Sequence, residues 1–168
     1  MDQRADGQAK TFNGCIVPAI NSNYVKTVIP YIKSATREIC VAMYLWNWYS
    51  FRGNAPMQRL SYQFLAAARR GVKVRVILNL DHVGGNLSRI NGQTANELRR
   101  AGIIVKLDTM SQVLHAKFVI IDQKIIILGS HNYSEKAINS NIETSCIIES
   151  PEVVPEYQKL FNTLFERI

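Results

Sequence analysis

The chain has 168 residues, of which 47% are hydrophobic and 20% charged, a balance typical of one globular domain and unlike that of a disordered chain. The formal net charge of +7 favours a polyanionic partner, either nucleic acid or an anionic membrane surface. A basic protein without such a partner fits the charge equally well. No run of about 18 apolar residues is present, so no membrane-spanning helix is expected.

The three cysteines, Cys15, Cys40 and Cys146, are odd in number and lack the spacing of a metal site. Cys40 and Cys146 lie in apolar runs, so we expect them to be buried free thiols, which weakly favours the cytoplasm. Residues 1–13 are polar and show no apolar stretch of a signal peptide. We therefore expect a polar N-terminal segment over 1–13 and a single domain over 14–168.

The first half of the domain is expected to alternate strands with helices. Residues 24–35 have helical apolar spacing, although Pro30 weakens or kinks the helix. A second helix over 57–70 is closed by Gly71. Apolar or alternating runs predict strands at 14–19, 38–45 and 72–80.

The second half begins with a loop at 81–92 that is rich in glycine and asparagine. A short helix is expected at 94–101 and is capped by Gly102. Strands follow at 103–107, 114–121, 125–130 and about 143–148, and an amphipathic helix covers 152–167. This order of elements predicts an α/β domain with a mixed β-sheet flanked by helices.

Polar residues gather where two of the expected strands meet. His115 and Lys117 share one face of a strand because side chains alternate along it. A two-residue turn at 123–124 would place Lys117 opposite Ser130 and His115 opposite Asn132. A slip of one residue would send Ser130 and Asn132 to the other face of the sheet.

These four groups together suit a phosphate ligand. Lysine supplies positive charge, while serine and asparagine supply directional hydrogen bonds. Histidine suits nucleophilic or proton-transfer chemistry near neutral pH. A single histidine or lysine in a strand usually has no catalytic role, but four polar groups between apolar strands are costly to bury without a purpose.

The run from His115 to Asn132 reads H-x-K-x4-D-x6-G-S-x-N, which resembles the signature of the phospholipase D superfamily. The segment 141–143 resembles the acidic element that follows this signature in the family. The order of elements from 35 to 167 is similar to that of the small single-motif endonucleases of the superfamily. The resemblance therefore implies a phospholipase D-like fold.

The resemblance also implies a role for each matching residue and no metal or other cofactor. His115 would be the nucleophile that forms a phosphohistidine. Lys117 and Asn132 would hold phosphate oxygens, and Ser130 would support the site. Glu143 would accept a hydrogen bond from the second ring nitrogen of His115.

Two motif residues are interpreted as structural: Gly129, and Asp122, which at a hairpin corner is expected to bind backbone amides. The motif occurs once, whereas the mechanism of the family needs two histidines. The resemblance therefore implies a homodimer with a composite active site. His131 has the wrong strand parity to serve as the second histidine, and His82 lies in a glycine-rich loop.

The segment 46–56 is an aromatic loop in which Trp46, Trp48 and Arg52 would bind substrate by stacking on single-stranded bases. The same aromatic residues would also suit a membrane interface, a dimer interface or the core. We therefore expect a metal-independent phosphodiesterase, first an endonuclease acting on DNA or RNA. The alternatives are a phospholipase D-type lipid hydrolase at a membrane surface and a module that binds nucleic acid without cleaving it.

Overall fold

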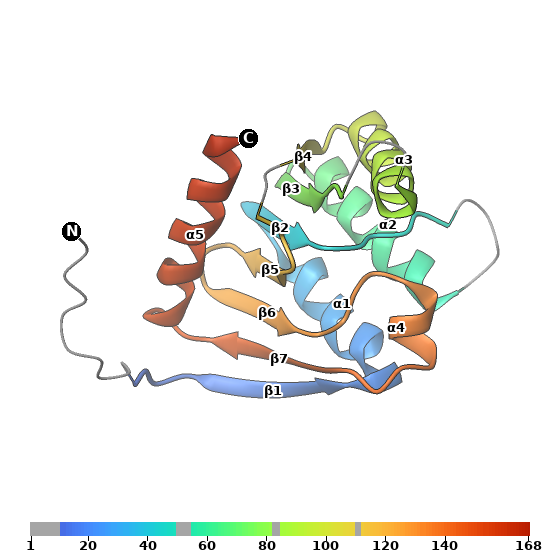
Figure 1. Cartoon of the computed structure of the whole chain (residues 1–168). Coiled ribbons are helices and arrows are strands. Elements are labelled where there is room, and N and C mark those ends of the chain that lie inside the picture. Colours follow the sequence, from blue (N-terminus) through green and yellow to red (C-terminus); the bar gives the residue numbers. More distant parts are fainter. Residues whose placement is uncertain (1–10, 50–54, 82–84, 110–111) are drawn as a thin grey trace.

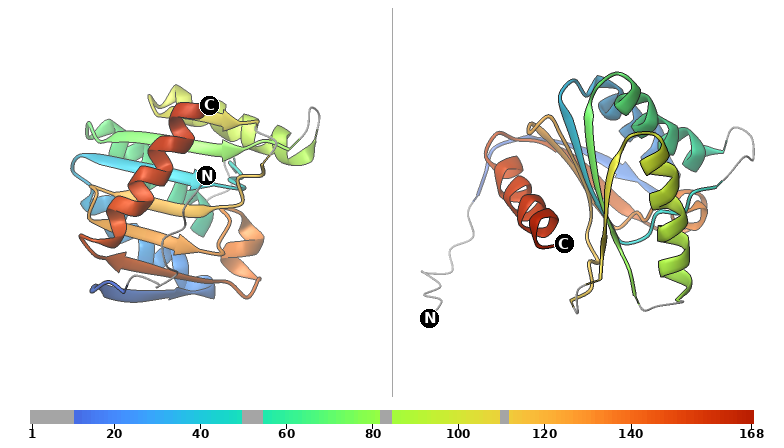
Figure 2. Two further views of the ribbon diagram at one scale, coloured as in Figure 1. Left: turned by 60° about the vertical axis from the view of Figure 1, so that its left-hand side comes forward. Right: turned by 90° about the horizontal axis from the view of Figure 1, so that it is seen from above.

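The computed structural model describes residues 11–49, 55–81, 85–109 and 112–168. A seven-stranded mixed sheet has the order β1-β7-β6-β5-β2-β3-β4 and carries helices on both faces (Figures 1 and 2). The strands are β1 (Cys15–Ile20), β2 (Glu38–Met43), β3 (Lys73–Asn79), β4 (Ile104–Asp108), β5 (Lys117–Ile121), β6 (Ile125–Gly129) and β7 (Thr144–Glu149). The helices are α1 (Tyr24–Ser34), α2 (Pro56–Arg69), α3 (Asn86–Arg100), α4 (Glu135–Asn139) and α5 (Val153–Arg167), with a 3₁₀ turn at Asn21–Asn23. The expected α/β class with a mixed, helix-flanked sheet is confirmed.

The sheet changes character at its centre. Strands β2, β3 and β4 pair in parallel, whereas β2–β5, β5–β6, β6–β7 and β7–β1 are antiparallel. The carboxyl ends of β2 and β6 therefore meet the amino ends of β5 and β7 at one edge, on the right of the sheet in Figure 1. The motif residues that flank these strand ends consequently gather at this edge.

Two apolar layers hold the sheet between its helices. Side chains of β5 alternate, so that Val119 and Ile121 join the larger cluster while Phe118 and Ile120 join the smaller one. Helix α5 covers the smaller cluster, and α1, α2 and α3 lie on the opposite side of the sheet (Figure 2). Among the described residues, no helix is long and apolar enough to cross a membrane.

Helix α3 corrects one sequence-based expectation. Residues 81–92 were expected to form a loop, but α3 begins at Asn86. Asn91 is fully buried, and its side chain accepts a hydrogen bond from Trp46 N and donates to the carbonyls of Tyr44 and Asn79. These tertiary hydrogen bonds make an asparagine-rich stretch helical despite its weak intrinsic propensity.

The turn between β5 and β6 corrects a second expectation. The register pairs Ile121 with Ile125, so three residues connect the strands instead of two. Asp122 and Gln123 both have positive φ, at 52° and 57°. Continued along the strands, this register places Lys117 opposite Gly129 rather than Ser130.

The Asp122 carboxylate explains the unusual turn. It accepts hydrogen bonds of 2.8–2.9 Å from the backbone N–H groups of Thr36, Arg37 and Glu38. The Thr36 hydroxyl donates a further bond, and the Arg37 guanidinium donates to the Asp122 carbonyl. Contacts with backbone amides are the kind expected for this residue from its place at the corner. These hydrogen bonds hold Asp122 in the left-handed conformation. The expected two-residue turn at 123–124 would have left Asp122 in an extended strand conformation.

We predict that Asp122→Ala lowers the free energy of unfolding by about 3 kcal/mol at neutral pH, because it removes several hydrogen bonds to a charged group. Burial opposes ionisation, but the hydrogen bonds outweigh it and lower the pKa of Asp122. Its contribution is therefore complete above the unfolded pKa of about 3.9 and is lost as pH falls through the lower folded value.

Denaturant titrations at pH 7 and in acid would measure this difference between the wild type and Asp122→Ala. Glu97→Gln is the matched control, since the contact of Glu97 within the described residues is an exposed ion pair with Arg100, worth less than about 1 kcal/mol. If the loss of unfolding free energy in Asp122→Ala grew in acid, the stabilising role of the ionised Asp122 carboxylate would be contradicted.

Candidate active site

The motif residues other than Asp122 line one open pocket, which lies where the ends of β2, β5, β6 and β7 meet. The pocket has a volume of about 570 Å³. It is lined by His115, Ala116, Lys117, Gly129, Ser130, Asn132, Glu143 and Thr144. The five residues expected to be catalytic are therefore together, although the register between β5 and β6 differs from the expected one.

The end of β6 explains how Ser130 reaches this pocket. Strict alternation in the observed register would place Ser130 on the opposite face from Lys117. Instead, the Thr144 N–H donates to Ser130 Oγ at 3.0 Å, while Ser130 N donates to the Thr144 carbonyl. The serine side chain is thereby held along the end of β7, where strand alternation no longer decides its direction.

Gly129 permits this close approach of two backbones. A Cβ at this position would collide with the Cα and Oγ of Ser145 and with the carbonyl of Thr144. Its φ of 158° is also one that side chains rarely adopt. The glycine of the motif is therefore required by the packing of β6 against β7.

His115 and Lys117 lie side by side at the pocket mouth. Lys117 Nζ is 3.1 Å from His115 Nδ1 and 3.3 Å from Nε2, and it donates to the His115 carbonyl at 2.7 Å. Burial lowers the pKa of Lys117, and the negative charge of Glu143 offsets part of this effect. His115 is exposed, so its ring is accessible to a substrate.

Glu143 makes different contacts from those expected. Its Oε2 accepts a hydrogen bond from Ser130 Oγ, and its Oε1 accepts one from Asn141 Nδ2 at 2.9 Å. Among the described residues, Glu143 forms hydrogen bonds with Ser130 and Asn141, and the expected bond with His115 is not among them. Burial opposes its ionisation, but the bonds from Ser130 and Asn141 and the charges of His131 and Lys117 outweigh burial and lower the pKa of Glu143.

Asn132 is held at the pocket by its neighbour in the chain. Tyr133 is fully buried, its N–H donates to the Leu45 carbonyl, and its carbonyl accepts from Asn47 N. The Oδ1 atom of Asn132 is buried and has no hydrogen-bond partner within the described residues. The carboxamide lines the same pocket as His115 and Lys117, and its Nδ2 group is the part that can donate to a phosphate oxygen.

His131 has a structural environment. It is 1% exposed, its ring stacks on Tyr24 with 4.2 Å between centroids, and Nδ1 lies 2.7 Å from Ser145 Oγ. Nε2 lies 3.1 Å from the Asn21 carbonyl. Burial lowers the pKa of His131. His82 lies outside the described residues.

The aromatic loop divides into two parts. Trp46 is fully buried, and its indole N–H donates to Ser61 Oγ at 3.1 Å. The expectation that Trp46 stacks on substrate is therefore wrong, because its ring is part of the core. Trp48 is half-buried and packs edge to face with Tyr62.

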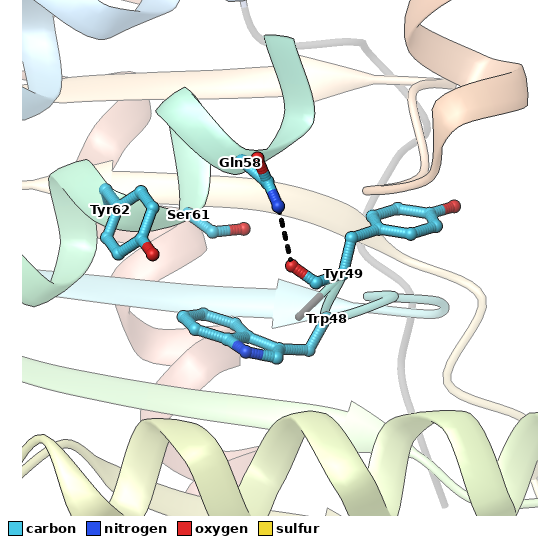
Figure 3. Close-up of a pocket in the computed structure, with 5 residues that line it drawn as sticks. All are labelled: Trp48, Tyr49, Gln58, Ser61 and Tyr62. Carbon is cyan, nitrogen blue, oxygen red and sulfur yellow. Dashed lines mark hydrogen bonds between the residues drawn. The ribbon is translucent and has the colours of Figure 1, made fainter. Parts of the chain in front are cut away.

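The pocket beside Trp48 is small (Figure 3). Its volume of about 10 Å³ leaves room for a single water molecule at most. The side chain of Gln58 bridges it by donating to the Tyr49 carbonyl at 3.0 Å. Arg52 lies outside the described residues, so the structure does not describe its position.

Tyr44 is a pocket neighbour that the sequence-based assignment did not single out. Its ring centroid lies 4.6 Å from that of His115, and Lys117 Nζ lies 5.1 Å from the ring. The sequence signal that could have identified Tyr44 was its place directly after the strand β2. The last residue of that strand, Met43, pairs with Lys117. No group of three or more His, Cys, Asp or Glu side chains within the described ranges could hold a metal ion.

A family model and several curated proteins match the sequence of this chain. A family model described as "Cardiolipin synthase, PLD-like domain" matches residues 28–165. The mitochondrial cardiolipin hydrolase of Mus musculus is 41% identical over 100 residues, which is 60% of this chain and 41% of that protein. The hydrolase of Xenopus laevis is 30% identical over 153 residues, 90% of this chain and 65% of that protein. The chain thus spans less than two thirds of either relative.

Two solved structures share the fold. The phospholipase D family member Nuc from Salmonella typhimurium superposes with a TM-score of 0.77 at 20% identity, covering 92% of this chain and 95% of that one. NucT from Helicobacter pylori gives 0.74 at 20% identity, covering 92% and 97%. The fold of the described chain is therefore that of these phospholipase D-like proteins.

We predict that Gly129→Ala lowers the free energy of unfolding by about 1–3 kcal/mol and reduces activity, because the added methyl group forces β7 away from the pocket. Thermal unfolding and a phosphodiester cleavage assay would measure both effects. Gly92→Ala in α3 is the matched control, since a Cβ there meets nothing within 4 Å. That control should be neutral or stabilising by up to about 1 kcal/mol. Equal behaviour of the two variants would contradict the packing argument.

Proposed function

The chain belongs to the phospholipase D-like family, and from this premise we propose that it is a metal-independent phosphodiesterase that acts through a phosphohistidine at His115. Nucleic acid, either DNA or RNA, is the favoured substrate. The observation that supports the proposal is one open pocket in which the exposed imidazole of His115 adjoins the ammonium group of Lys117, and which the ionised carboxylate of Glu143 also lines.

The proposed reaction assigns one task to each side chain. A ring nitrogen of His115 attacks phosphorus, an N–P bond forms, and the P–O bond to the leaving group breaks. Lys117 and Asn132 bind non-bridging oxygens as charge develops on them. The Ser130 hydroxyl donates its hydrogen to Glu143 and accepts from Thr144 N, so Ser130 supports the site by holding this carboxylate at the pocket wall. Water then hydrolyses the phosphohistidine.

The leaving oxygen needs a proton, and a second histidine is the proposed donor. His131 cannot supply it, because the ring is buried and both of its nitrogens lie close to other groups. We therefore propose a two-fold homodimer in which His115 of the partner subunit protonates the leaving group and later activates water.

The net charge of +7 suits nucleic acid and an anionic membrane surface alike, and nucleic acid is preferred because the single motif in a small domain resembles the small endonucleases of the superfamily. A specific observation favours a second candidate, a lipid hydrolase at a membrane surface: the sequence relatives are named mitochondrial cardiolipin hydrolases. A module that only binds nucleic acid is ranked third, since a binding role needs no nucleophile and His115 lies exposed beside Lys117.

We predict cleavage of single-stranded DNA or RNA in excess EDTA. The logarithm of the binding constant should fall linearly with the logarithm of the salt concentration, with a slope of about −0.7 per phosphate contacted. The assay compares single- and double-stranded DNA and RNA with vesicles of phosphatidylcholine and of cardiolipin. Turnover of cardiolipin alone would select the lipid hydrolase. Activity that disappears in EDTA and returns with magnesium would refute the metal-independent mechanism.

We predict that His115→Ala abolishes turnover and retains fold and binding, whereas Asn132→Ala lowers the rate by about 10²–10³. Purified mixed dimers of one wild-type and one His115→Ala chain should be nearly inactive, because the composite site lacks its nucleophile or its acid. Half of the wild-type rate in mixed dimers, or an active monomer by light scattering, would show that each chain holds a complete site.

A further inference from the structure

Tyr44 is anchored at the pocket through its backbone. It is the first residue after β2, its N–H donates to the Ala116 carbonyl at 3.1 Å, and its carbonyl accepts from Asn91 Nδ2 at 2.8 Å. Ala116 lies between His115 and Lys117. The backbone contacts therefore fix the Tyr44 Cα beside both functional residues without any contribution from the ring.

The Tyr44 ring contacts both of these residues. It is tilted by 56° against the imidazole of His115 at a centroid distance of 4.6 Å, and Lys117 Nζ lies 5.1 Å from its centre. An aromatic face at this distance attracts a cation. The ring thus adjoins one group that is cationic and another whose ring becomes cationic once it is bonded to phosphorus.

The Tyr44 side chain contributes little to the core. It is half-buried and belongs to neither hydrophobic cluster. Within the described part of the chain its hydroxyl forms no hydrogen bond with a protein group. Packing of the fold therefore does not account for an aromatic residue here, whereas the contacts with His115 and Lys117 do.

The His115 ring is exposed, and within the described ranges Glu143 bonds Ser130 and Asn141 rather than the imidazole. In-line attack on phosphorus requires that a ring nitrogen be held in one direction, and small misplacements reduce rates strongly. We infer that Tyr44 is a positioning residue, whose aromatic face holds the His115 imidazole and the Lys117 ammonium for attack. The inference rests on the proposed function and deepens it.

The test compares Tyr44→Leu and Tyr44→Phe, with bis-p-nitrophenyl phosphate as a diester that is independent of the natural substrate class. We expect Tyr44→Leu to lower kcat by about 10–10²-fold with little change in KM, because orientation rather than binding is lost. Tyr44→Phe should retain kcat within about twofold, because the ring and not the hydroxyl makes the contacts. The ring-proton resonances of His115 should shift in Tyr44→Leu and remain in place in Tyr44→Phe.

Tyr62→Leu is the matched control. Tyr62 is 45% exposed, its ring packs edge to face with Trp48, and it lines a different pocket from His115, so this variant should keep the wild-type kcat. Thermal unfolding of both leucine variants shows whether either change acts through stability.

The outcomes separate this inference from the proposed function. If His115→Ala is inactive while Tyr44→Leu keeps its kcat, the role of Tyr44 is wrong and the proposed function stands. Equal losses of kcat in Tyr44→Leu and Tyr44→Phe, or an effect confined to KM, would also show that the positioning role of Tyr44 is wrong. If His115→Ala still cleaves the diester, the proposed function itself fails.

Discussion

The Asp122 carboxylate is the contact on which the geometry of the site depends. It ties the turn between β5 and β6 to the backbone before β2, and the three-residue turn sets the register of the hairpin. The same contacts fix the end of β5 against the start of β2, and the β2–β5 pairing places Lys117 opposite Met43, next to Tyr44, at the other end of the strand. A motif residue outside the pocket therefore positions the residues within it.

The site combines a rigid wall with an accessible nucleophile. Gly129 lets β6 and β7 approach closely, and the Ser130–Glu143 pair sits on that junction with the carboxylate ionised. His115, which is exposed, and Lys117, which is half-buried, line the same pocket side by side. This arrangement suits the phosphate of a diester of either class, so the pocket chemistry leaves the choice between nucleic acid and lipid to the surrounding surface and its charge.

Local signals were sufficient for most of the regular elements, α3 and α4 excepted. The expected helices at 57–70 and 152–167 agree with α2 and α5 to within a residue. Apolar periodicity and the glycine that follows α2, Gly71, are signals that lie within the helix or next to it in the sequence. The strands that form the centre of the sheet were equally readable as apolar runs. Short α4, which Ser134 caps through its hydroxyl, had no apolar periodicity long enough to reveal it.

The sequence by itself determined the family signature and hence which polar residues form the pocket, because residue identity at fixed spacing needs no tertiary information. Tertiary structure alone decided the three-residue turn at Asp122, the helical state around Asn91 and the burial of Trp46. Each depends on hydrogen bonds or packing between segments far apart in the chain. Such contacts override local propensity, and no short window of sequence contains both of the partners.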